Sequence, residues 1–132
     1  MKTYNQNSLN FVEDLLGMQI SENSFVVDIQ QQISNQNELY DMYKRTVTFP
    51  DYFGDNWDAF FDVLKDLSWV PQENIIIRHF FLPVLPENEL RVYLEILADS
   101  VEFWTKFDRH KMVVYFSIEV EEKIKELMSK SK

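Results

Sequence analysis

Four aspartates recur at short intervals in one segment of the chain, and carboxylates so spaced can bind cations or perform acid–base chemistry. Asp58, Asp62 and Asp66 follow one another at intervals of four residues, and Asp55 precedes Asp58 by three. Residues at this spacing lie on one face of an α-helix. Like charges four residues apart destabilise a helix by roughly 0.2–0.5 kcal/mol per pair. The spacing therefore predicts a helix with one acidic face, on which the neighbouring carboxylates repel one another.

Two of these aspartates have an ordinary structural explanation. Asp55 is expected to cap the amino terminus of the helix, and Asp58 lies in the first turn, where the helix dipole favours a negative charge. Neither explanation applies to Asp62 or Asp66, which lie further along. Two interpretations of the acidic face remain open on spacing alone: an ordinary solvated surface, or a surface that binds a cationic partner.

Paired carboxylates also serve enzymes as general acid and base when their surroundings separate their pKa values. The chain has 132 residues, no cysteine, two glycines, and two histidines far apart in sequence, His79 and His110. It has no glycine-rich phosphate loop and no nucleophile elbow. A thiolate nucleophile and cysteine-based metal sites are excluded, and a histidine-rich metal site is not expected. We predict no catalytic residue, no metal and no cofactor, with an enzyme as the less favoured alternative.

The overall charge restricts the kinds of partner. Lys and Arg number 13 against 22 Asp and Glu, which gives a formal net charge of −9 at pH 7. Such a protein is repelled by the phosphates of nucleic acids and by anionic lipid headgroups, so neither a nucleic acid nor a membrane is expected as partner. Residues 1–17 lack the apolar stretch of a signal peptide. We expect a cytoplasmic protein whose partner is basic.

The elements that must position the acidic face alternate between strand and helix. Hydrophobic patterning predicts strands at 24–29, 74–80 and 112–118, and helices at 36–45, 56–68, 86–107 and 119–130. A further short helix is predicted at 8–17, with Gly17 in a left-handed conformation after its last turn. This alternation indicates an α/β fold with a three-stranded parallel sheet and right-handed crossover helices. The length fits a single domain over residues 1–132.

The acidic segment resembles the signature of a known protein family. The run from Pro50 to Leu64, PDYFGDNWDAFFDVL, closely resembles the barstar signature P-E-Y-Y-G-E-N-L-D-A-L-W-D-x-L without a gap. Barstar-like proteins are intracellular inhibitors of the secreted ribonuclease barnase. The predicted order of strands and helices over about 24–118 is also that of barstar-like proteins. On this comparison, the N-terminal helix and the C-terminal helix are additions.

The resemblance implies a mechanism in which an acidic helix and the loop before it cover the basic active site of a ribonuclease. Asp62 matches the family's central anchoring aspartate, Asp58 a second interfacial aspartate, and Tyr52 a tyrosine that packs over a catalytic-site histidine of the enzyme. Trp69 resembles an interfacial tryptophan, although one extra residue precedes it. The implied partner-binding residues are Tyr52, Gly54, Asn56, Trp57, Asp58, Phe61, Asp62, Trp69 and Glu102.

The sequence also departs from the family pattern. Phe61 stands where barstar has tryptophan and Trp57 where it has leucine, which changes the surface offered to the target. Glu95, Asp99 and Glu102 form a second acidic stripe, which is either solvated or an extension of the binding surface; Asp99 is an alternative to Glu102 as a contacting carboxylate. The resemblance implies a one-to-one complex with a basic ribonuclease. An immunity protein for a different toxin, on the same scaffold, remains an alternative.

Overall fold

The four strands of the sheet are all parallel and are arranged in the order β1-β4-β3-β2. They are β1 (Leu9–Val12), β2 (Ser24–Ile29), β3 (Asn74–His79) and β4 (Lys111–Ser117). The computed structural model describes residues 8–130, so part of the segment for which no signal peptide is expected lies outside it. The predicted α/β fold with a parallel sheet is confirmed, but the sheet has four strands rather than three.

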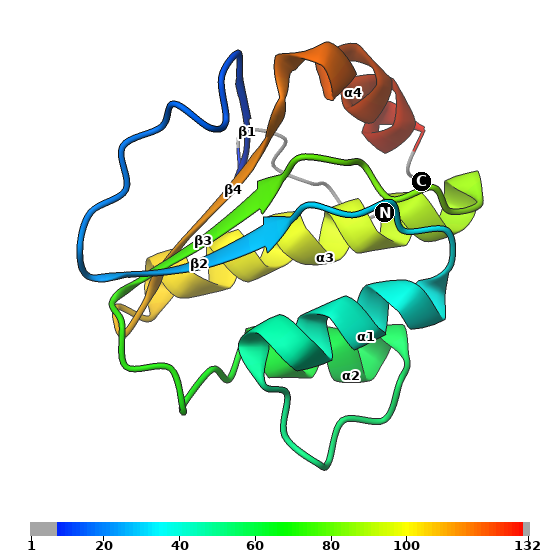
Figure 1. Ribbon diagram of the computed structural model, residues 1–132. Coiled ribbons are helices and arrows are strands. Elements are labelled where there is room, and N and C mark those ends of the chain that lie inside the picture. Colours follow the sequence, from blue (N-terminus) through cyan, green and yellow to red (C-terminus); the bar gives the residue numbers. More distant parts are fainter. Residues whose placement is uncertain (1–7, 131–132) are drawn as a thin grey trace.

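Four helices accompany these strands within residues 8–130. They are α1 (Gln36–Val47), α2 (Trp57–Leu64), α3 (Glu87–Lys106) and α4 (Glu121–Ser129), the last preceded by the short 3-10 helix η2 (Ile118–Val120). The connection from β2 to β3 contains α1 and α2, and the connection from β3 to β4 contains α3. Both connections step across the sheet in the same direction, so right-handed crossovers place α1, α2 and α3 on one side of it (Figure 1).

The prediction of a helix at 8–17 is wrong, because the first part of this segment forms the strand β1. Leu9 pairs with Val114 at the edge of β4. The apolar positions fit a helix, but Leu9 and Phe11 also alternate as in a strand, and a short apolar run does not distinguish the two. The edge of β4, distant in sequence, decides the outcome by offering hydrogen-bond partners. Gly17 does not take the predicted left-handed conformation either, because its φ is not positive.

The face of the sheet toward α1, α2 and α3 carries the hydrophobic core. Side chains alternate along β4, and Met112, Val114 and Phe116 are buried. In the register of the sheet, Val114 lies beside Ile77 of β3 and Leu9 of β1, both buried as well. Burial of each such side chain stabilises the fold by about 1.5–3 kcal/mol. This layer is the support on which α3 packs.

Aromatic side chains hold α2 against its neighbours. Phe60 is fully buried, and its ring centroid lies 4.9 Å from that of Tyr43 in α1 and 6.0 Å from that of Tyr93 in α3. Trp57 packs edge-on against Tyr40 of α1, with centroids 5.5 Å apart. These contacts bury one face of α2, so its opposite face is left to the solvent.

A chain of hydrogen bonds runs through the core beneath this cluster. Nδ1 of His79 lies 3.1 Å from the carbonyl oxygen of Tyr115, and Nε2 lies 2.7 Å from the hydroxyl of Tyr93. A carbonyl oxygen only accepts, so Nδ1–H donates to it and Nε2 accepts from Tyr93. The Tyr43 hydroxyl, 2.8 Å away, then donates to the oxygen of Tyr93. Burial lowers the pKa of His79 to about 3, which keeps the ring neutral at pH 7.

Candidate partner-binding site

The amino terminus of α2 is fixed by Asn56. Its side-chain oxygen accepts a hydrogen bond from the N–H of Ala59 at 2.8 Å, and its side-chain nitrogen donates to the carbonyl oxygen of Gly54 at 3.2 Å. The predicted cap, Asp55, is wrong: this residue has a φ of 53° and forms an ion pair with Lys44 of α1 at 2.8 Å. Asn56 and Gly54 therefore set the shape of the loop that leads into the helix.

The carboxyl end of α2 is held by side chains from α3 and from the turn after it. The last carbonyl groups of a helix have no partner within the helix and need donors from elsewhere. The carbonyl oxygen of Leu64, the last residue of α2, accepts from the indole N–H of Trp104 at 2.9 Å. In the segment after α2, the carbonyl oxygen of Asp66 accepts from Arg109, and that of Leu67 lies 3.1 Å from Nε2 of His110. Both ends of α2 are thus anchored, and the helix presents its exposed side chains from a fixed position.

Asp58 and Asp62 are the carboxylates on the exposed face of α2. Asp58 lies in the first turn, and the side chain of Asp62 is 74% exposed. Because they are four residues apart, the two carboxylates lie on the same side of the helix. The ion pair between Asp62 Oδ1 and Lys65 Nζ is long, at 3.9 Å. This pair of carboxylates is well placed to meet cationic groups of another molecule.

Asp66 does not extend this helical face, because α2 ends at Leu64 rather than at the predicted residue 68. Its Oδ2 accepts a hydrogen bond from the hydroxyl of Tyr52 at 2.6 Å. That bond lowers the pKa of the Asp66 carboxyl and raises the pKa of the Tyr52 hydroxyl. Tyr52, which precedes α2 and is 63% exposed, is therefore held by a residue that follows α2 in the chain. The loop before the helix and the segment after it form one connected surface.

A hollow of about 190 Å³ lies between α2 and α3. Its walls combine apolar and acidic side chains: Trp57, Asp58, Phe61, Val92, Glu95, Ile96 and Asp99. Two carboxylates of α3 thus join Asp58 of α2 around an apolar floor. Glu102, which sequence reasoning assigned to the site, is half-buried on α3 and does not line this hollow, whereas its alternative Asp99 does.

Lys65 is a residue of this surface that the sequence analysis did not single out. Its Nζ lies 3.9 Å from the centroid of the Phe61 ring and 3.9 Å from Oδ1 of Asp62. The available signal was the spacing, because Lys65 follows Asp62 by three residues and Phe61 by four, and such residues are neighbours on a helix. The acidic surface therefore contains a cation beside Asp62.

Trp69 lies in the segment after α2 and is half-buried. Its indole N–H donates to the carbonyl oxygen of Val47 at the end of α1, at 2.8 Å. This hydrogen bond attaches the segment to α1, so the polar atom of Trp69 is already used within the molecule.

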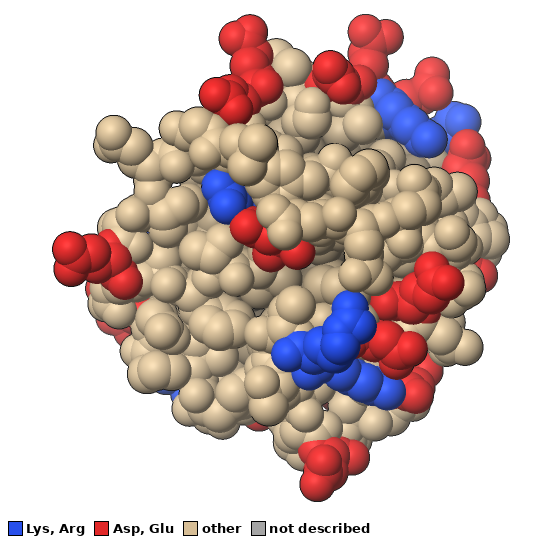
Figure 2. All heavy atoms as spheres, in the orientation of Figure 1, with Lys and Arg blue, Asp and Glu red and all other residues tan. Residues whose placement is uncertain are grey.

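Some of the basic side chains are paired with a nearby carboxylate. Figure 2 shows them gathered over α1 beside acidic side chains, and the last turn of α1 carries Lys44 and Arg45. The ion pair of Lys44 with Asp55 is one such pair, and on the sheet Arg78 binds Asp28 at 2.7 Å. Pairing with these carboxylates offsets the charges of Lys44 and Arg78.

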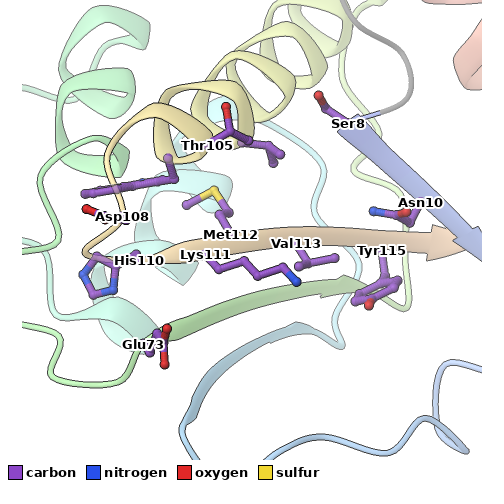
Figure 3. A pocket seen from close by; sticks show the side chains of 12 residues that line it. Ser8, Asn10, Glu73, Thr105, Asp108, His110, Lys111, Met112, Val113 and Tyr115 are labelled. Carbon is purple, nitrogen blue, oxygen red and sulfur yellow. The ribbon is translucent and has the colours of Figure 1, made fainter.

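A separate hollow of about 530 Å³ lies at the edge of β4 beside β1 (Figure 3). Ser8 and His110 both line it, but they lie at opposite ends in Figure 3. The two ring nitrogens of His110 lie 2.9 and 3.1 Å from the carbonyl oxygens of Gln72 and Leu67. Both nitrogens are thus directed at backbone carbonyl oxygens and not at the hydroxyl of Ser8, so this hollow does not have the geometry of a hydrolytic site.

Metal-binding clusters and membrane-spanning helices are both absent from residues 8–130. No group of three or more His, Asp or Glu side chains in this range is arranged to hold a metal ion. No helix in the described part of the chain is long and apolar enough to cross a membrane.

Alanine substitutions at Asp62 and Asp66 are expected to differ in their effect on stability. Asp62→Ala removes an exposed carboxylate with a long ion pair, so the free energy of unfolding should change by less than about 0.5 kcal/mol. Asp66→Ala removes the acceptor of the Tyr52 hydroxyl and should lower it by about 0.5–1.5 kcal/mol. Urea unfolding of both variants beside the wild type measures the difference. A larger loss for Asp62→Ala would mean that Asp62 has a structural role.

Comparison with known proteins agrees with the resemblance of the α2 segment. Residues 23–117 match the family model described as Barstar (barnase inhibitor). The matched region runs from just before β2 to the end of β4, so β1 and α4 lie outside it. No curated protein matches the chain. Because the match spans more than two thirds of the chain and contains both α2 and the loop before it, the protein belongs to the barstar family.

Proposed function

We propose that this protein inhibits a barnase-type ribonuclease by covering the basic active site of the enzyme with α2 and the loop before it. The observation that carries the proposal is the pair of exposed carboxylates, Asp58 and Asp62, on a helix anchored at both ends. A site that binds RNA phosphates presents cationic groups, and carboxylates at fixed positions can occupy those groups in place of phosphate. Membership of the barstar family supports this assignment.

The anchoring of the site favours tight binding. Tyr52 is held by Asp66, and Asn56 fixes the loop at Gly54, so these groups lose little conformational freedom when a partner docks. Trp57 and Phe61 supply apolar contact beside the carboxylates, and Asp99 extends the acidic surface onto α3. In this proposal Glu102 and Trp69 lie at the margin. The protein acts as a single domain, binds its target one to one, requires no cofactor and performs no catalysis.

The proposal places the protein in the cytoplasm, where an inhibitor protects the cell that makes the nuclease. A second candidate is an immunity protein for a toxin other than a ribonuclease. The surface around Asp62 favours this candidate, because the aromatic residues Trp57 and Phe61 differ from the family signature and Lys65 covers Phe61. These differences alter the shape and charge offered to a target without changing the scaffold.

The experiment that tests the proposal is titration of barnase, the enzyme in the family description, with the purified protein while RNA hydrolysis is followed. Inhibition that is complete at one equivalent supports the proposed function and stoichiometry. Binding to a toxin that does not cleave RNA, without inhibition of barnase or of other basic ribonucleases, supports the second candidate. RNA hydrolysis by the purified protein alone would contradict both.

A further inference from the structure

Lys65 lies on the proposed binding face in the position that a partner's cation would need. Its Nζ lies over the ring of Phe61 and beside the carboxylate of Asp62, both at 3.9 Å. A cation above an aromatic ring and next to a carboxylate is also the arrangement in which an arginine or lysine of a basic protein would bind these two side chains. The side chain of Lys65 is 30% exposed, so much of it is packed against the protein.

We propose that Lys65 is a specificity-determining residue that excludes partners whose docking surface is uniformly cationic. The proposal rests on the proposed function, because it assigns Phe61 and Asp62 to the binding face. A partner's cation that approaches Asp62 meets the ammonium group of Lys65 at short range. Binding then requires that Lys65 move aside and find another acceptor.

The surroundings of Lys65 do not readily supply that acceptor. A hollow of about 500 Å³ lies next to it, and the Phe103 ring in its wall is 6.0 Å from Nζ. Two further cations, Lys106 and Arg109, line the same hollow, and they repel a lysine that turns into it. Two carboxylates also line it, Asp66 and Asp108, but they are balanced by these two cations, and Asp66 already accepts the Tyr52 hydroxyl. A carboxylate next to the cations of the partner is therefore the group that satisfies Lys65 in a complex.

The test uses peptides of defined charge and the intact protein. Nona-arginine represents a purely cationic partner, and a peptide of the same length with glutamate at every third position represents a cationic partner with carboxylates. Lys65→Met keeps the apolar stem over Phe61 and removes the charge. Lys123→Met, on the exposed surface of α4, changes the net charge equally and is the matched control. Unfolding curves verify that each variant is folded.

At low ionic strength, Lys65→Met is expected to bind nona-arginine about threefold or more tightly than Lys123→Met does. This gain should vanish with the glutamate-containing peptide, and Lys65→Arg should bind as the wild type does. An equal gain for Lys65→Met and Lys123→Met with nona-arginine would overturn the role of Lys65. Asp62→Asn separates this result from a failure of the proposed function: if it leaves the affinity for nona-arginine unchanged, the face of α2 is not the binding site and both proposals fail.

Discussion

The Asp62→Ala variant is expected to dissociate from the inhibited ribonuclease far faster than the wild-type protein does. In the proposed complex the carboxylate of Asp62 loses its hydration and lies among several cationic groups of the enzyme. Its removal leaves those groups buried and unpaired, which weakens binding by at least about 2–5 kcal/mol. Most of the loss should appear in the dissociation rate, which stopped-flow mixing and displacement experiments measure.

Asp51→Ala provides the matched control for this variant. Asp51 is exposed in the loop before α2, outside the hollow shared with α3, so it acts on a partner mainly at long range. Its removal should slow association, and the effect should fade between about 0.01 and 0.1 M salt as the Debye length falls from about 30 to about 10 Å. Asp66 is unsuitable as a control because it holds Tyr52. If Asp62→Ala inhibits as the wild type does, the face of α2 is not the binding surface.

The sequence was sufficient to predict the elements whose residues form continuous or periodic hydrophobic patterns. The β-branched run Ile75–Ile77 predicted β3, and 3.6-residue periodicity predicted α3 to within one residue at each end. Leu9–Val12 was assigned to the wrong class because four residues carry too little pattern to separate helix from strand. Its pairing with β4 depends on contacts between residues about a hundred positions apart, which no local pattern contains.

The candidate site was predictable only where it depends on helical spacing. Asp58 and Asp62 share one side of α2, as their four-residue spacing predicts. The early end of α2 was not predictable, because its last carbonyl group accepts from Trp104, forty residues away. The same is true of the bond between Tyr52 and Asp66, which joins two segments that flank the helix and follows from where the helix stops.

Tyr93→Phe is expected to lower the free energy of unfolding by about 2–6 kcal/mol, although it removes a single oxygen atom. The Tyr93 hydroxyl donates to Nε2 of His79 and accepts from Tyr43, and all three side chains are buried. Its loss leaves one acceptor and one donor without a partner in the core, each costing about 1–3 kcal/mol. Because domains of this size are stable by only about 5–15 kcal/mol, the effect should be large in urea unfolding.

Tyr43→Phe distinguishes this explanation from simple loss of a buried hydroxyl. Tyr43 is the first donor in this series of hydrogen bonds, and without its hydroxyl Tyr93 still donates to His79. The free energy of unfolding should therefore fall by only about 0.5–1.5 kcal/mol. Equal losses for the two variants would contradict the assigned direction of the hydrogen bonds. Should Tyr93→Phe fail to fold, the direction remains testable in the wild type by nitrogen NMR of His79. A proton on Nδ1 is expected, since that nitrogen faces the carbonyl oxygen of Tyr115. A proton on Nε2 alone would mean that the hydrogen bonds run in the opposite direction and would overturn the prediction.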